Sequence, residues 1–291
     1  MSVAFALHIK EKFQGPPASE ALDKGLRLEG TNGDAVILIH GMTGTPNEMM
    51  YLANFLNKKG YTVHCPRLAN HGSPIWILKY TKWQDLYNTV RATFMELSQK
   101  HRRVYVSGLS MGGLLGLLLA EEFKGKVAAV SCLSPTLFYD GWNTPWYRFL
   151  LPVAYYTPLK YWLFFKESPP YGIKNKAIQR RVDEYYQKAD LADMSGVAQF
   201  GYPFFPVSLL YQLEKLREHL TRRLSNIATP LQLIQAEQDD MTSVKNAQFI
   251  YDRVKSSQKE IVLLYNSYHV ITADQERGEV AARVEKFFAS I

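Results

Sequence analysis

The sequence predicts an α/β protein with a doubly wound, mostly parallel sheet, and two observations lead to this fold class. Short apolar runs rich in β-branched residues alternate with longer segments of helical period. These runs lack the polar alternation of a half-exposed strand, as expected of parallel strands covered by helices on both faces. In addition, 47% of the 291 residues are hydrophobic and 21% are charged, so the chain can bury a large core.

Four of the expected strands precede residue 135. They are AVILIH (35–40), YTVHCP (61–66), RVYVSG (103–108) and KVAAVSCLS (126–134). The segment 45–60 carries helix boundary signals, with Thr45 as N-cap, a proline at the first helical position and Glu48 closing a capping box. Segment 81–101 has an apolar stripe of helical period, which predicts a crossover helix.

The alternation resumes near the C-terminus. Strands are expected within 230–240 and 260–267, with a helix near 243–254 between them and another near 273–290. We therefore expect the core to be built from residues 1–134 and 228–291, as strand and helix alternation builds a parallel sheet.

Residues 135–227 break the pattern and are expected to form an inserted helical cap. Twenty of the 38 aromatic residues lie between Phe138 and Tyr211. Helices are expected at 173–189 and 206–224, and no segment reads convincingly as a strand. This insert is either a small helical subdomain with an aromatic core or a lid over a pocket at the strand ends.

One stretch of the insert, FLLPVAYYTPLKYWLFF (149–165), is apolar enough to suggest a membrane. Two prolines and Lys160 interrupt it and its 17 residues are at the short limit for a span, so we expect no transmembrane helix. Trp and Tyr beside a lysine suit a bilayer surface, so weak membrane-surface contact through the cap is kept as an interpretation.

The net charge and the cysteines indicate which partners and which cellular compartment to expect. The net charge is +7, but the basic clusters at 101–103 and 179–181 are short and no nucleic-acid module accompanies them, so we expect no nucleic-acid partner. Cys65 and Cys132 each lie in an apolar run, as free buried thiols often do. With no secretory h-region at the start of the sequence, these features predict a cytoplasmic protein.

Ser110 is the candidate nucleophile. It lies in the Gly-x-Ser-x-Gly motif of SGLSMGG, between an expected strand and the expected helix 111–123. That strand, sharp turn and helix are the context in which the turn presents a reactive serine. Gly108 and Gly112 are expected because side chains there would collide with the neighbouring chain.

A reactive serine needs a base, and the base needs an orienting acid. In this topology both follow the serine along the chain, each on a loop after a later strand. His269 follows the last strand and is the expected base, whereas His219 falls within a charged helix and is expected on a solvated face. The acid is expected in EQDDM, where Glu237, Asp239 and Asp240 all qualify; spacing does not separate the two aspartates, and we expect one of them to face solvent.

The attacked carbonyl also needs backbone N–H donors aimed at its oxygen. We expect these from Met111, directly after the serine, and from Met42 in the HGMTG loop. His40 is expected to hold this loop rather than to react, and His71 to be structural or to line the pocket.

The motifs LIHGMTGTPNEM, GLSMGG, QAEQDDM and SYHVITADQE resemble the bacterial carboxylesterase and monoacylglycerol lipase family of small cap-bearing α/β-hydrolases. The resemblance covers about 34–134 and 228–290. It implies Ser110 as nucleophile, Asp239 as acid and His269 as base, with the Met42 and Met111 amides as the oxyanion hole. Two departures are a longer aromatic insert and Tyr268, where a glycine is expected before the histidine.

These features predict a serine hydrolase that cleaves carboxylic esters through an acyl-enzyme, without a metal or organic cofactor. The aromatic cap suggests a small ester with an apolar acyl or aryl group, such as a monoacylglycerol or lysophospholipid. A thioesterase, an amidase, a C–C hydrolase or an acyltransferase would use the same residues, and a non-catalytic ligand-binding protein on this fold is a further alternative. The sequence leaves the oligomeric state open.

Overall fold

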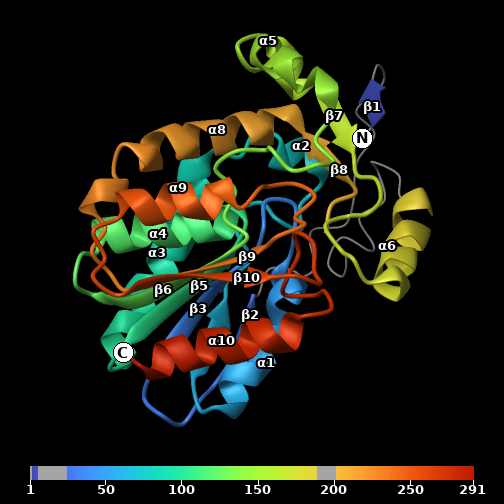
Figure 1. Cartoon of the computed structure of the whole chain (residues 1–291). Coiled ribbons are helices and arrows are strands. Elements are labelled where there is room, and N and C mark those ends of the chain that lie inside the picture. The colour runs from blue at the N-terminus through green and yellow to red at the C-terminus, as the bar shows by residue number, and fades with distance from the viewer. Residues whose placement is uncertain (1, 6–24, 189–200) are drawn as a thin grey trace.

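A computed structural model describes residues 2–5, 25–188 and 201–291 (Figure 1). Its centre is a seven-stranded sheet with the strand order β10-β9-β6-β5-β3-β4-β2. The strands are β2 (Leu26–Leu28), β3 (Ala35–Ile39), β4 (Thr62–Cys65), β5 (Val104–Leu109), β6 (Val127–Leu133), β9 (Leu231–Ala236) and β10 (Lys259–Leu264). Only the edge strand β2 is antiparallel to its neighbour in this sheet. The predicted α/β class with a mostly parallel sheet is confirmed.

Helices cover both faces of the sheet (Figure 1). The helices α1 (Met50–Lys58) and α10 (Arg277–Ala289) pack on one face, where side chains such as Leu56, Val284 and Phe288 are fully buried. The other face carries α3 (Trp83–Lys100), α4 (Met111–Glu122), α8 (Val207–Thr221) and α9 (Lys245–Arg253). The central strands β3, β5, β6 and β9 are therefore buried almost throughout, whereas the edge strand β10 is only partly covered.

The segment predicted as a helix over 45–60 begins as a 3-10 turn, η1 (Pro46–Met49), and continues as α1. Thr45 caps it, since its hydroxyl accepts a hydrogen bond from the Asn47 amide. Glu48 differs from the expectation of a capping box. Its carboxylate accepts the Gly41 N–H at 3.0 Å, so it stabilises the loop after β3.

The chain between β6 and β9 contains several short elements before α8. They are η2 (Trp146–Leu150), α5 (Leu151–Tyr155), η3 (Pro158–Tyr161), β7 (Leu163–Lys166), α6 (Lys176–Lys188) and β8 (Phe204–Pro206). The expectation of no strand here was wrong: β7 pairs antiparallel with β8 and also with β1 (Ser2–Phe5). Aromatic residues such as Phe164, Phe165 and Phe205 favour a pleated surface on which their rings are buried.

In the described ranges, none of the helices combines the length and apolarity needed to cross a membrane. Residues 149–165 fold instead as the short elements from η2 to β7. Cys65 and Cys132 are buried free thiols.

Candidate active site

Ser110 lies on the turn between β5 and α4, where the sequence predicted it. Its backbone has φ +57° and ψ −118°, a strained conformation for a residue with a side chain. A Cβ on Gly108 would lie 2.2 Å from the carbonyl carbon of Gly112, and one on Gly112 would lie 2.3 Å from the Ile39 oxygen. Glycines at both positions therefore allow the turn to be this tight, and the turn places Ser110 at the N-terminus of α4.

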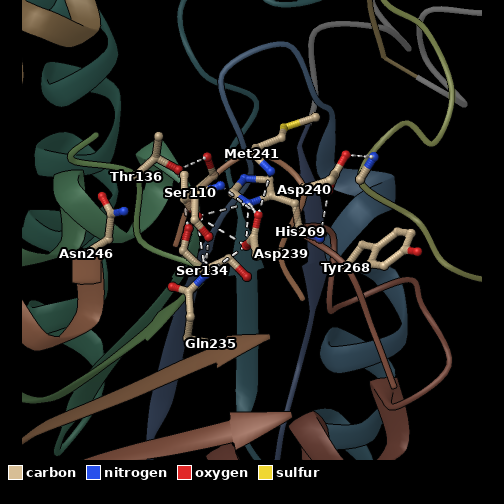
Figure 2. Close-up of polar contacts among 12 residues, drawn as sticks. Ser110, Ser134, Thr136, Gln235, Asp239, Asp240, Met241, Asn246, Tyr268 and His269 are labelled. Carbon is tan, nitrogen blue, oxygen red and sulfur yellow. Dashed lines mark hydrogen bonds and ion pairs between the residues drawn. The ribbon is translucent and has the colours of Figure 1, made fainter. Parts of the chain in front are cut away.

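The hydroxyl of Ser110 is hydrogen-bonded to the hydroxyl of Thr136, with 2.7 Å between the oxygens (Figure 2). Thr136 is buried and also donates to the carbonyl oxygen of Ser134 at 3.3 Å. Thr136 was not among the residues predicted from the sequence. The signal was available, because Thr136 follows β6, which is the neighbour of β5 in the sheet.

His269 and Asp239 meet after the last two strands of the core. The Asp239 carboxylate lies 2.8 Å and 3.1 Å, through its two oxygens, from Nδ1 of His269 (Figure 2). The same carboxylate accepts the amides of Met241 and Thr242, each at 2.8 Å, and the side-chain amide of Gln235 at 2.7 Å. These bonds hold the carboxylate in one orientation beneath the imidazole ring.

The carboxylate of Asp240 contacts the backbone of the same histidine. It accepts the His269 N–H at 3.3 Å and the Gly172 N–H at 3.2 Å (Figure 2). The expectation that one of the adjacent aspartates faces solvent was wrong, because Asp239 is 3% and Asp240 1% exposed. Residues of the insert cover the loop, so the second carboxylate is buried beneath Gly172.

Electrostatics at this pair favour a charged imidazole. Burial is the largest effect on His269 and opposes the charge, but the adjacent Asp239 carboxylate, with Asp240 and Glu48, raises the pKa of His269 above its ordinary value. For Asp240, burial raises the pKa to about 6, against the lowering effect of His269.

The loop after β3 lies against Ser110. A Cβ built on Gly41 would be 3.9 Å from the Cβ of Ser110. Met42 and Met111, whose amides are the predicted oxyanion-hole donors, are both buried. The loop is held by His71, whose Nε2 lies 2.7 Å from the Met42 oxygen.

His40 also stabilises the loop after β3. Its Nδ1 lies 2.8 Å from the Gly41 oxygen, and its Nε2 accepts the Leu68 N–H at 3.2 Å. The rings of His40 and His71 are in edge contact, and burial lowers the pKa of both. Both histidines therefore have structural contacts, as expected for neutral imidazoles inside the fold.

Two further carboxyl groups line the site, Glu48 and Glu167. Burial raises the pKa of Glu48 to about 7, despite the Gly41 N–H that its carboxylate accepts. Burial, followed by the nearby Asp240 charge, raises the pKa of Glu167 to about 8. Neither role was predicted from the sequence, because Glu48 was expected in a helix cap and Glu167 lies in the insert, where no motif marks it.

Ser110 and His269 line one cavity of about 230 Å³. A second cavity of about 490 Å³ adjoins it and is lined mainly by apolar side chains of the insert and α8, among them Phe149, Tyr156 and Leu213. The two cavities share Tyr139, Glu167, Phe205 and Met241 as walls. The two cavities therefore lie next to each other at these four residues, one beside Ser110 and the other among apolar side chains.

The remaining candidate residues lie elsewhere. His219 is half-buried against the Trp83 ring, 4.9 Å between centroids, rather than solvated as expected. The Tyr268 ring points away from Ser110 (Figure 2) and packs against Trp142 of the insert. The described residues hold no cluster of three or more His, Cys, Asp or Glu side chains suited to a metal ion.

Comparison with known proteins places this arrangement in a family. The family model described as serine aminopeptidase, S33, matches residues 31–276. The thermostable monoacylglycerol lipase of Bacillus sp. (strain H-257) is 30% identical over 254 residues, which cover 87% of this chain and 90% of that protein. The carboxylesterase of Bacillus subtilis (strain 168) is 26% identical over 258 residues, covering 88% and 93%.

A solved structure reported with the metagenome-derived lipolytic enzymes LipS and LipT is similar across the fold. It superposes with a TM-score of 0.77 at 25% identity and covers 92% of this chain and 98% of its own.

Proposed function

The chain belongs to the serine aminopeptidase S33 family of α/β-hydrolases and is an ester hydrolase, and from that premise we propose that it cleaves carboxylic esters through Ser110, His269 and Asp239. One observation carries the assignment. The strained Ser110 and the imidazole of His269 line the same cavity, and the ring is fixed from behind by the Asp239 carboxylate 2.8 Å away.

The mechanism follows from these positions. Nδ1–H of His269 donates to Asp239, which leaves Nε2 as the basic nitrogen. His269 removes the Ser110 proton as the serine oxygen attacks the acyl carbon, and it returns that proton to the departing alcohol. Water, activated by the same imidazole, then attacks the acyl-enzyme and releases the acid. Asp239 stabilises the imidazolium in both steps.

The oxyanion of each tetrahedral intermediate is assigned to the amides of Met42 and Met111. Support comes from the approach of the loop after β3 to Ser110 and from the position of Met111 at the start of α4. A fixed donor of this kind contributes roughly 10²–10³ in rate. Glu48 and His71 hold the loop that contains Met42, so they are positioning residues in this scheme.

The substrate class is inferred from the second cavity. Its mainly apolar walls and volume of about 490 Å³ suit an acyl chain, with the ester at Ser110 in the adjoining cavity. Two relatives named as a monoacylglycerol lipase and a carboxylesterase support the same class. A monoacylglycerol or lysophospholipid is therefore the proposed substrate.

A profile of acyl-chain length and headgroup on the purified chain tests this proposal. Esters of increasing chain length, matched thioesters, matched amides and an aminoacyl anilide are compared by kcat/KM. We expect esters with medium or long acyl chains to have the highest kcat/KM. A higher kcat/KM for the aminoacyl anilide would assign a peptidase activity instead, and failure of Ser110 to react with a fluorophosphonate probe would favour a non-catalytic binding protein.

A further inference from the structure

The insert exposes a concentration of large apolar side chains. Of the thirteen exposed large hydrophobic residues in the described part of the chain, eight lie within 142–162. We call these eight the apolar rim: Trp142, Trp146, Phe149, Leu150, Val153, Tyr156, Leu159 and Trp162. Single exposed hydrophobic residues are ordinary on a protein surface, whereas a cluster in 21 residues marks an interaction site.

The part of the apolar rim on and beside α5 lies at the outer edge of the molecule (Figure 1). Figure 1 shows α5 at the far end of the insert, beyond α8 and away from the central sheet. Within α5, only Ala154 is buried. The surface continues onto the α2 segment (Ile75–Leu78) and the residues after it, since the half-exposed Tyr161 ring lies 5.3 Å from that of the exposed Tyr80.

The segment that carries most of the rim has only basic charges. Residues 141–166 contain no Asp or Glu but include Arg148, Lys160 and Lys166. Lys79 lies over the Trp162 ring at 5.4 Å, and Lys215, which also pairs with Glu218 at 3.0 Å, lies over the Tyr156 ring at 5.8 Å. Aromatic rings flanked by lysines are the composition of a segment that lies in the headgroup region of a bilayer. This charge favours anionic headgroups.

The rim also forms the entrance to the larger cavity. Phe149 and Tyr156 are exposed rim residues and line the cavity of about 490 Å³ at the same time. The same cavity shares Glu167 and Met241 as walls with the cavity that contains Ser110. A second protein copy seated on the rim would cover this entrance, whereas a lipid layer would supply apolar molecules to it.

We propose that the apolar rim docks on an anionic lipid surface, so that the acyl chain of the substrate passes from the lipid into the cavity without crossing water. The identity of the transferred molecule rests on the proposed ester hydrolysis. The docking itself does not, because the rim and its basic side chains act without Ser110.

The test uses the full-length chain carrying Ser110→Ala, so that no lipid is consumed. Its partition onto phosphatidylcholine vesicles with and without phosphatidylglycerol is measured by co-sedimentation and tryptophan fluorescence. We expect binding that rises with phosphatidylglycerol and falls with added salt. Val153→Glu with Leu159→Glu places two charges on the rim without touching a cavity wall, and should weaken binding at least about tenfold.

Tyr51→Glu with Met95→Glu is the matched control, because it adds the same two charges at exposed apolar positions on α1 and α3. This control should bind vesicles like the parent chain. Equal binding by the rim variant, or absence of parent binding to phosphatidylglycerol vesicles, would overturn the proposal. Light scattering measures the oligomeric state of both chains. If the parent chain is a dimer and the rim variant is a monomer, the rim is an interface with a second copy and the proposal is overturned.

With Ser110 restored, the rim variant should hydrolyse a short water-soluble ester at the parent rate and lose activity on vesicle-bound ester. If the parent chain binds vesicles but hydrolyses no ester, the proposed function fails and the docking stands.

Discussion

The Asp239 carboxylate lies 2.8 Å from Nδ1 of His269, while its neighbour Asp240 binds only the backbone N–H of the same histidine. Two adjacent carboxylates therefore contact one residue in different ways. One can stabilise charge on the ring, and the other fixes where the loop lies.

Substituting the two aspartates separates these contributions. Asp239→Asn keeps the size of the side chain but removes the charge that stabilises the imidazolium, so we expect kcat to fall by about 10⁴. Asp240→Asn retains an oxygen that can accept one of the two N–H groups, and should cost less than about tenfold. Steady-state kinetics on one soluble ester measure both, and equal mild losses would contradict the assignment of Asp239.

The pH dependence of kcat/KM reports on the same pair. His269 acts as a base when neutral, and its pKa is raised, so activity should rise with pH with an inflection above the ordinary histidine value of about 6.5. Removing the Asp239 charge removes a cause of the raised pKa, so Asp239→Asn should move the inflection to lower pH. An unchanged inflection would mean that another group controls the acidic limb.

Ser110→Ala and His269→Ala should each abolish ester hydrolysis, leaving roughly 10³–10⁴ over the water rate from binding and the oxyanion hole. Because the two residues act as a unit, the double variant should be no slower than either single one. Single-turnover kinetics with circular dichroism as a folding control test this. Additive losses would show that the two side chains act in separate steps.

Glu48 should affect kcat through the loop that contains Met42. Glu48→Ala removes the acceptor of the Gly41 N–H, so the loop loses its fixed position and kcat should fall up to about 10²-fold with little change in KM. Glu48→Gln supplies a neutral oxygen to the same N–H and should restore most of the rate. If both variants raise KM equally, Glu48 acts on substrate binding instead.

The core of the site was predictable because it depends on chain order in a parallel sheet. Ser110 follows the middle strand and His269 the last one, and the ends of parallel strands meet at one edge. The choice between Asp239 and Asp240 was open from the residues alone, because adjacent positions in a loop point in directions that only the packed fold sets. It was the resemblance that selected Asp239.

The secondary structure of the insert was harder to predict from the sequence. The strand β7 (Leu163–Lys166) lies at the end of the apolar stretch 149–165, where no strand was expected, and its partners β8 and β1 are far away in the chain. Such pairing depends on tertiary contacts rather than on local propensity. Glu167 illustrates the consequence: it follows β7 directly, so its place at the junction of the two cavities could not be foreseen without that strand.

Glu167 should also make stability depend on pH. Its pKa is raised from about 4.5 to about 8 on folding, so between these values the folded chain binds more protons than the unfolded chain. Stability from this group is therefore present at low pH and lost as pH rises through 8. Glu167→Gln abolishes the titration, so the Tm of the variant relative to the parent should increase from pH 5 to pH 8. Thermal unfolding at matched ionic strength measures this, and a Tm difference that stays constant with pH would show that Glu167 is already ionised in the folded protein.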